Sequence, residues 1–180
     1  MSSEIRLTPT SFVVLGLVEA AGEATPYDLK NMVAASLGNF WSLQHAQLYS
    51  EPQRLTAAGY LTERRETDGR RRRHYRLAAK GEEVLREWLA EPTAELTELR
   101  DLALLKVFFG ASPTAMAAEQ VKAHRGKLAE YEAIMERAGA DLPRGVRLSL
   151  EAGILSERTW VRFWSGRRSS GDTTRCIMMS

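Results

Sequence analysis

Apolar residues in the first part of the chain recur at the spacing of short helices. Thr8 and Pro9 precede an apolar stretch that ends at Gly22, which predicts a first helix capped by Thr8 with Pro9 in its first turn. Thr25 and Asp28 repeat this logic, because Thr25 is suited to cap a second helix and Asp28 follows three residues later, as in a capping box. The pattern therefore predicts two short helices in succession.

A third helix completes this layout. We expect the second helix to close at residues 38–39, and the third to begin at about Ser42 and to run to Ala58, with Gly59 as its stop. Pro52 removes one backbone hydrogen bond of the third helix, so it should bend that helix or confine its first half. Three short helices joined by tight turns predict a helix-turn-helix.

The next stretch has the alternating polarity of β-strands. Residues 60–67 and 70–77 are two extended runs separated by Asp68 and Gly69. Asp-Gly between such runs is a strong hairpin signal, because a two-residue turn of this type needs positive φ angles at both central positions. The sequence therefore predicts a two-stranded wing after the third helix.

The remaining apolar pattern is helical. A linking helix is expected from residues 80–81 and to end before Pro92, followed by one element over residues 96–109. Apolar residues then recur in alternating steps of four and three over residues 117–135, and a final helix is expected over residues 144–165.

The predicted fold class is thus mostly α, with an N-terminal winged helix-turn-helix, a two-stranded wing and an all-α dimerisation domain. We assign residues 1–91 to the winged helix domain and residues 92–165 to the helical domain. The polar composition of residues 166–180 favours a disordered tail.

Charge is distributed unevenly. The 180 residues carry a formal net charge of +2, but residues 64–76 contain seven arginines against Glu66 and Asp68, a local balance of +5. A concentrated basic patch on a nearly neutral protein is the electrostatic pattern of a polyanion binder. The alternative is an ordinary solvated run of charges, and the charge count alone leaves both open.

Other patterns bear on cell compartment and cysteine chemistry. The longest apolar run, residues 12–18, is interrupted by Gly16 and is too short to span a bilayer, and no secretory cleavage pattern follows Glu4 and Arg6. The only cysteine, Cys176, excludes a disulfide or a Cys-based zinc site within one chain. We expect a soluble protein of the cytoplasm that does not associate with membranes.

Enzyme signatures are missing from the sequence. It contains no Gly-rich phosphate loop, no Gly-x-Ser-x-Gly and no His-Glu-x-x-His. His45, His74 and His124 lie in three separate predicted elements, so we expect no metal site. The prediction is a protein that is not an enzyme and that has no catalytic residues and no cofactor.

Short motifs in the first half resemble those of PadR-type transcriptional regulators, and their order and spacing together carry the resemblance. They are Tyr27-Asp28-Leu29-Lys30, Phe40-Trp41-Ser42-Leu43, Gln47-Leu48-Tyr49, Arg54-Leu55, Gly59-Tyr60-Leu61, and Arg73-His74-Tyr75-Arg76-Leu77 followed by Gly81. The all-helical second half is similar in length and position to the dimerisation domain of the larger PadR subfamily. The family's usual Thr before the linking helix is Ala78 here, so that helix lacks a capping side chain.

The resemblance implies that the third helix lies in the major groove of double-stranded DNA, with its N-terminal residues at base edges. Glutamine pairs with adenine through two hydrogen bonds, and serine and tyrosine suit bases or phosphates. For Tyr49 the alternative is a buried aromatic that braces the motif, and the Ser42 oxygen has capping as a second use. The expected contacts from this helix are Ser42, Gln44, His45, Gln47 and Tyr49.

The wing and two further cations form a second expected set. Arginines at a hairpin tip reach a phosphate backbone or the narrow minor groove, which predicts DNA contacts for Arg70, Arg71, Arg72 and Arg73. Arg54 and Lys30 are candidate phosphate contacts, with ordinary solvated helix residues as the alternative.

Together these expectations predict a homodimeric repressor that binds a palindromic operator, because a twofold axis relates two equivalent half-sites. A ligand-responsive sensor is the alternative, in which an aromatic or drug-like molecule at Trp160 and Trp164 releases the DNA. Those two tryptophans have a second interpretation as anchors of the dimer. A protein-interaction module that no longer binds DNA is the third possibility, against which the wing arginines argue.

Overall fold

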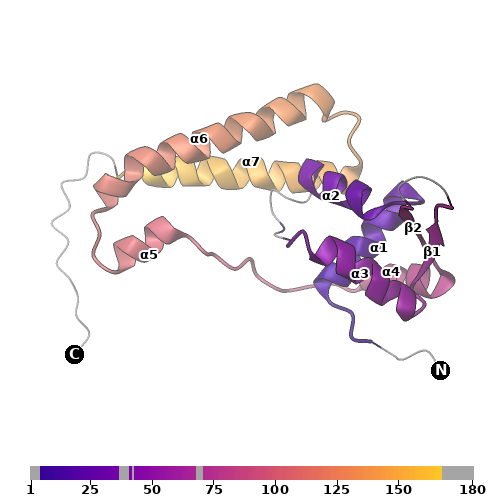
Figure 1. Cartoon of the computed structure of the whole chain (residues 1–180). Coiled ribbons are helices and arrows are strands. Elements are labelled where there is room, and N and C mark those ends of the chain that lie inside the picture. Colours follow the sequence, from indigo (N-terminus) through magenta and orange to yellow (C-terminus); the bar gives the residue numbers. More distant parts are fainter. Residues whose placement is uncertain (1–4, 37–40, 42, 68–70, 168–180) are drawn as a thin grey trace. The chain divides into compact units, whose positions relative to one another are not determined.

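The computed structural model describes residues 5–36, 41, 43–67 and 71–167. The chain divides into two compact units, which we call the N-terminal unit (up to Glu95) and the C-terminal unit (from Leu96) (Figure 1). The elements of the N-terminal unit are α1 (Pro9–Ala21), α2 (Pro26–Ala35), α3 (Gln47–Ala57), β1 (Leu61–Arg65), β2 (Arg73–Leu77) and α4 (Ala79–Ala90). Those of the C-terminal unit are α5 (Leu102–Phe108), α6 (Pro113–Ala138) and α7 (Arg144–Ser165).

The caps predicted for α1 and α2 are confirmed. Thr8 is the N-cap of α1, and Gly22 ends that helix with a φ of 69°, in the left-handed region that favours glycine. At α2 the Thr25 N–H donates to Asp28 Oδ2 at 2.9 Å, and the Asp28 N–H donates to Thr25 Oγ1 at 3.2 Å. This reciprocal pair satisfies two backbone donors that the helix itself leaves unpaired.

The predicted start of the third helix is wrong. Residues 43–46 are not α-helical, and α3 begins only at Gln47. Before it the backbone makes a tighter turn, in which the N–H of Gln47 donates to Gln44 O at 2.9 Å and that of Leu48 to His45 O at 3.1 Å. The Gln47 side chain supports this turn, because its Oε1 accepts the Gln44 N–H at 3.1 Å. Ser42 and the predicted close of α2 at residues 38–39 lie outside the described residues.

Pro52 lies in the interior of α3, and its ring is buried. Since proline has no N–H, the carbonyl of Leu48 loses its partner within the helix. The segment of α3 before Pro52 is little more than one turn, because the helix begins only at Gln47. A short first half is one of the two effects predicted for Pro52, and a bend is the other.

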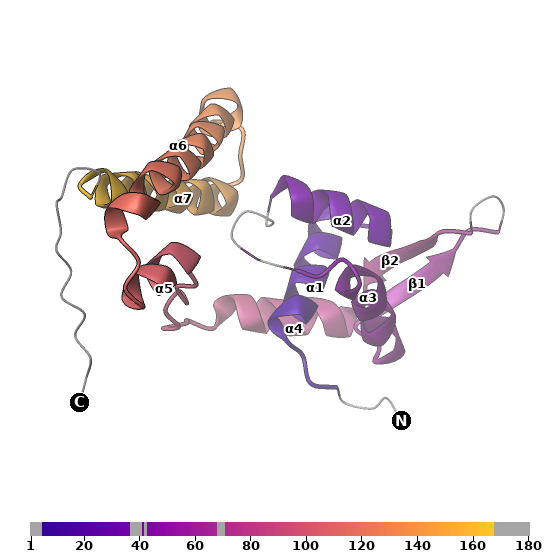
Figure 2. The ribbon, with the colours of Figure 1, turned by 60° about the vertical axis from the view of Figure 1, so that its left-hand side comes forward.

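The hairpin forms with a longer loop than predicted. β1 and β2 are antiparallel, with Glu63 opposite Tyr75 and Arg65 opposite Arg73. A two-residue turn at positions 68 and 69 would pair Glu63 with His74, so the observed register adds one residue to the loop. Residues 68–70 lie outside the described residues. In Figure 2 the two strands run away from the helices of the N-terminal unit.

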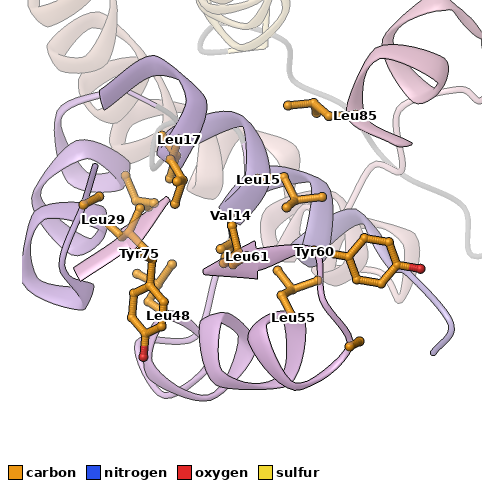
Figure 3. Packing of buried hydrophobic residues seen from close by; sticks show 14 residues of the cluster. Val14, Leu15, Leu17, Leu29, Leu48, Leu55, Tyr60, Leu61, Tyr75 and Leu85 are labelled. Carbon is orange, nitrogen blue, oxygen red and sulfur yellow. The ribbon is translucent and has the colours of Figure 1, made fainter. Parts of the chain in front are cut away.

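The N-terminal unit has its own apolar core. Leu15 and Val18 of α1, Leu29 of α2 and Leu48 of α3 are fully buried, and Tyr75 of β2 joins them. Figure 3 shows Leu29, Leu48 and Tyr75 of this core, which come from two helices and the hairpin. Ala24, just before α2, pairs with Tyr75 through two backbone hydrogen bonds of 3.1 and 2.9 Å, which fixes the hairpin to the helix-turn-helix.

In the C-terminal unit, α6 and α7 lie side by side, and α5 is shorter than predicted. The expected element over residues 96–109 is wrong in its first half, because helix begins at Leu102. Asp101 is the cap, and its Oδ1 accepts the Leu104 N–H at 2.9 Å. The two long helices match the predicted positions, and α7 has the predicted bounds of residues 144–165.

The core of the C-terminal unit is small. Its buried cluster consists of Ala103, Ala117, Val121 and Trp164, and Tyr131 of α6 and Ile154 of α7 are buried outside that cluster. Just beyond α7, the Arg167 guanidinium lies 3.5 Å from the ring centroid of Phe163, and its Nη1 donates to Phe163 O at 2.6 Å. The predicted disorder is thus wrong for residues 166–167, whereas residues 168–180 lie outside the described residues.

Candidate nucleic-acid interface

The turn before α3 and its first residues present polar side chains to solvent. Gln44 and His45 are exposed, and Tyr49 in the first turn of α3 is 46% exposed. Tyr49 is therefore not the buried brace that the sequence left open. Gln47 is half-buried, and because its Oε1 is bound to the Gln44 N–H at 3.1 Å, the two glutamines form one local structure.

Arg54 has partners within the N-terminal unit. Its Nε donates to Glu51 Oε2 at 2.9 Å, its Nη2 to Ser11 Oγ at 2.9 Å and its Nη1 to the carbonyl of Arg6 at 3.1 Å. Ser11 is fully buried on α1 and donates its hydroxyl to Glu51 Oε1 at 2.6 Å. We call Ser11, Glu51 and Arg54 the α1–α3 triad, because it joins these two helices.

The α1–α3 triad changes the acidity of its carboxylate. Burial raises the pKa of Glu51, but hydrogen bonds from Arg54 and Ser11 outweigh it, so the pKa of Glu51 lies below its ordinary value. The triad was missed from the sequence because Ser11 and Arg54 are 43 positions apart. A serine within an apolar helix was the available signal, since a buried hydroxyl requires a partner.

The wing arginines fall into two groups. Arg71 and Arg72 are exposed, and neither guanidinium forms an ion pair within the described part of the chain. Arg73 lies 3.6 Å from Glu63 Oε2, and Arg65 is bound to the same carboxylate. Arg70 lies outside the described residues.

A second carboxylate holds the opposite face of the wing. Glu23, in the connection between α1 and α2, accepts from Arg64 Nη2 at 2.6 Å and from Arg76 Nε at 2.5 Å. His74 lies between two acids, with Nδ1 2.9 Å from Glu23 Oε1 and Nε2 3.0 Å from Glu66 Oε1. We call these five residues the Glu23 cluster. Hydrogen bonds from Arg64 and then Arg76 hold the pKa of Glu23 below its ordinary value.

The remaining predicted site residues are Lys30, Trp160 and Trp164. Lys30 is half-buried on α2 and forms no ion pair with the described residues. Trp164 is fully buried in the core of the C-terminal unit, where its ring packs against the other core residues. Trp160 is half-buried, stacks on His124 with centroids 5.9 Å apart, and meets Phe163 edge-on at 5.6 Å.

The described residues also bear on metal binding and on membrane association. They hold no group of three or more His, Cys, Asp or Glu side chains placed to bind a metal ion. Among them there is also no helix both long and apolar enough to cross a membrane.

Comparison with known proteins identifies the family. Residues 14–87, which contain α3 and the whole wing, match the model of the transcriptional regulator PadR-like family. The chain therefore contains a domain of the PadR-like family of transcriptional regulators. Residues 99–165 of this PadR-like chain match a second model, described as the virulence activator alpha C-terminal domain. The helical second half therefore fits the larger subfamily, as the resemblance implied.

Individual relatives agree with this assignment. The PadR-like chain is 28% identical to the negative transcriptional regulator PadR of Bacillus subtilis over 133 residues, 70% of this chain and 72% of that protein. The structure of Bacillus subtilis PadR in complex with operator DNA is similar with a TM-score of 0.79 at 25% identity, over 90% of this chain and 97% of that one. A PadR-like regulator from Bacillus cereus shares the fold with a TM-score of 0.73 at 19% identity, over 88% and 95% of the two chains.

Proposed function

We propose that this PadR-like protein is a repressor that binds a palindromic operator as a homodimer. The observation that carries the proposal is that one winged unit presents exposed Gln44, His45 and Tyr49 together with the exposed arginines Arg71 and Arg72. The relative of known structure is bound to operator DNA, which supports the same use of this fold here. In this proposal the protein is cytoplasmic and associates with the nucleoid when it binds DNA.

In this proposal the start of α3 reads bases and the wing binds phosphates. Gln44 is the principal base contact, because its side chain is exposed while that of Gln47 supports the turn. Arg71 and Arg72 bind the phosphate backbone, with Arg70 and Arg73 beside them, and Lys30 is a further candidate for a phosphate. Arg54 acts through the α1–α3 triad and orients α3 from within the unit.

The C-terminal unit supports the proposed dimer. α5 and its C-cap residue leave four large apolar side chains exposed, and α7 leaves three more, which is a surface of the kind that normally binds a partner. We assign this surface to a second copy of the chain, which puts the half-sites about one turn of DNA, roughly 10 bp, or a multiple of it apart. The residues are Leu102, Leu105, Phe108, Phe109, Val146, Leu148 and Leu155.

DNA from upstream of the protein's own gene, titrated by fluorescence anisotropy, tests the proposal. Gln44→Ala should weaken operator binding by about 1–3 kcal/mol and relax the preference for particular base pairs. Gln53→Ala is the matched control, because Gln53 lies on α3 with its Nε2 bound to Tyr49 O. Equal losses on operator and on random DNA would refute the assignment of base contacts to Gln44.

The wing is tested by salt dependence. Arg71→Ala/Arg72→Ala removes up to four phosphate contacts per dimer and should flatten the slope of log K against log salt by roughly 2–4 units. Arg86→Ala on α4 is the control, because Arg86 is exposed outside the wing. An unchanged slope would mean that Arg71 and Arg72 do not contact phosphates and are ordinary solvated charges.

A second candidate function is release of DNA by an aromatic small molecule. It is favoured by Trp160, whose half-buried ring stacks on His124, while His124 Nδ1 lies 2.6 Å from Glu157 Oε2. A Bacillus subtilis PadR structure of the same fold, at 24% identity and with a TM-score of 0.72, contains p-coumaric acid. If p-coumaric acid releases operator DNA from the wild type but not from Trp160→Leu, the sensor is supported. Identical release from both excludes Trp160 as the site.

A further inference from the structure

Glu23 occupies the point where the hairpin meets the helix-turn-helix. It follows Gly22, whose φ of 69° ends α1, and precedes Ala24, which pairs with Tyr75 through backbone hydrogen bonds of 3.1 and 2.9 Å. The Tyr75 side chain is buried in the core, so the neighbouring residues His74 and Arg76 face the other side of β2. That side is where the Glu23 carboxylate lies.

Both strands of the wing bind this one carboxylate. Arg64 comes from β1 and Arg76 from β2, and they donate to different oxygens of Glu23, at 2.6 and 2.5 Å. His74 is opposite Arg64 in the hairpin and adds a third contact at 2.9 Å. The Glu23 side chain is 19% exposed, so its ion pairs are partly shielded from solvent.

His74 extends the cluster toward the tip. Its second ring nitrogen faces Glu66, whose Oε2 also accepts the backbone N–H of Arg72 at 3.2 Å. A neutral imidazole carries one N–H and donates to only one of two carboxylates, whereas the protonated ring donates to both. A continuous chain of contacts therefore runs from Glu23 through His74 and Glu66 to the backbone of Arg72.

We propose that Glu23 is a positioning residue for DNA recognition, which holds the wing at the angle where Arg71 and Arg72 reach phosphates while α3 lies in its groove. The proposal rests on the proposed function, since it assigns a role within operator binding. Glu23 would thus contribute to the preference for operator DNA without contacting the DNA, since a carboxylate is not itself attracted to phosphates.

An electrostatic role and a positioning role of Glu23 predict opposite changes in operator affinity for Glu23→Gln. The substitution removes a negative charge near a DNA-binding surface, so charge alone predicts tighter binding to every DNA. Positioning predicts that operator binding weakens while binding to random DNA is unchanged or tighter. The ratio of the two affinities should fall about tenfold, which is within the range for the loss of one specific contact.

The experiment measures two quantities for the wild type, Glu23→Gln, Glu23→Asp and Glu19→Gln. Glu19 is the matched control, because it is exposed on α1, one turn before Glu23, and changes the charge equally. The first quantity is the ratio of operator to random-DNA affinity. The second is hydrogen exchange of the Ala24 and Tyr75 amides in the DNA-free protein, which reports on the attachment of the wing.

We expect Glu23→Gln to lower the affinity ratio and to speed exchange at both amides, Glu23→Asp to restore part of each, and Glu19→Gln to change neither. Faster exchange with an unchanged ratio would make Glu23 a purely structural residue and overturn the proposal. Unchanged exchange would overturn it as well, because the wing would then not depend on Glu23. A wild type with no preference for its own upstream DNA would instead refute the proposed function, and the exchange result would still report on the cluster.

Discussion

Substitution of Gly81 tests how closely the wing domain is packed. Gly81 lies in the first turn of α4 and is buried. A Cβ atom at this position would overlap the carbonyl oxygen of Tyr60 and lie 3.1 Å from Leu77 Cδ2. The Tyr60 oxygen has no freedom to move away, because it accepts the Ala78 N–H at 3.1 Å. Gly81→Ala must therefore displace either the start of α4 or the connection between α3 and β1, which contains Tyr60.

The expected free-energy change has three parts. Overpacking of a close contact costs about 1–3 kcal/mol. Loss of the hydrogen bond from Ala78 to Tyr60 costs about 1 kcal/mol more, and the better helix propensity of alanine recovers a similar amount. The net expectation is a destabilisation of about 1–3 kcal/mol, and 2 kcal/mol lowers Tm by roughly 10 °C in a domain of this size.

The assay is urea unfolding followed by circular dichroism, with Gly16→Ala as the control. A Cβ at Gly16, within α1 of the same unit, meets nothing within 4 Å, so that substitution should stabilise by about 0.5–1 kcal/mol. Opposite signs for the two substitutions are the expected result. If Gly81→Ala is as stable as the wild type, the close approach of α4 to Tyr60 is not a constraint, and the reasoning fails.

Three further predictions concern the α1–α3 triad, the C-terminal core and the dimer surface. The lowered pKa of Glu51 means that folding favours the ionised carboxylate, so the stability that this group contributes above about pH 4.5 should be lost as pH falls toward the folded-state pKa. Glu51→Gln should remove this part of the acid dependence, which urea titrations between pH 3 and 7 would measure. Trp164→Ala should cost about 3–5 kcal/mol in thermal unfolding, and Trp164→Phe less, since the buried indole N–H has no hydrogen-bond partner among the described residues. Phe108→Glu should dissociate the proposed dimer at micromolar concentration in sedimentation velocity, whereas Lys106→Glu on the same helix should not. If the Phe108→Glu variant is still a dimer, the interface lies elsewhere.

Helix ends were predictable where the deciding contact is local. Thr25 and Asp28 are three residues apart, so the capping box of α2 is legible in the sequence and forms as expected. For α3, the search for a capping residue predicted a start at about Ser42, but the turn before Gln47 determines where the helix begins. A capping residue marks a possible start, and the side chain that satisfies the backbone there decides the actual one.

Apolar spacing overestimated the helix before α6. Leu96 and Leu99 fit the period of α5, yet they are 94% and 61% exposed and lie outside it. A helix of a folded chain is stabilised chiefly by packing of its apolar face. These leucines contact no core within the C-terminal unit, so the pattern alone could not determine where α5 begins.

Ion pairs and hydrogen bonds between residues far apart in the chain could not be predicted from the sequence. The exposed side chains at the start of α3 and at the wing tip were predictable from the order of elements. The partners of Arg54 and Arg64 were not, because Ser11 is 43 positions from the first and Glu23 is 41 positions from the second. The charge count over residues 64–76 therefore overestimated the positive charge of the wing that is available for DNA, because Arg64 and Arg76 are paired with Glu23.

The distinction between paired and unpaired arginines leads to a measurable difference in DNA binding. Counterion release requires a cation that neutralises a phosphate, and a cation already bound to a carboxylate contributes less. Arg64→Ala/Arg76→Ala and Arg71→Ala/Arg72→Ala remove the same charge from the same hairpin, but only the first pair has Glu23 as its partner. On random DNA, the second double variant should flatten the salt slope by up to about 4 units per dimer, and the first by less than half of that. Equal slopes would mean that the Glu23 cluster opens when DNA binds and that all four arginines then contact phosphates.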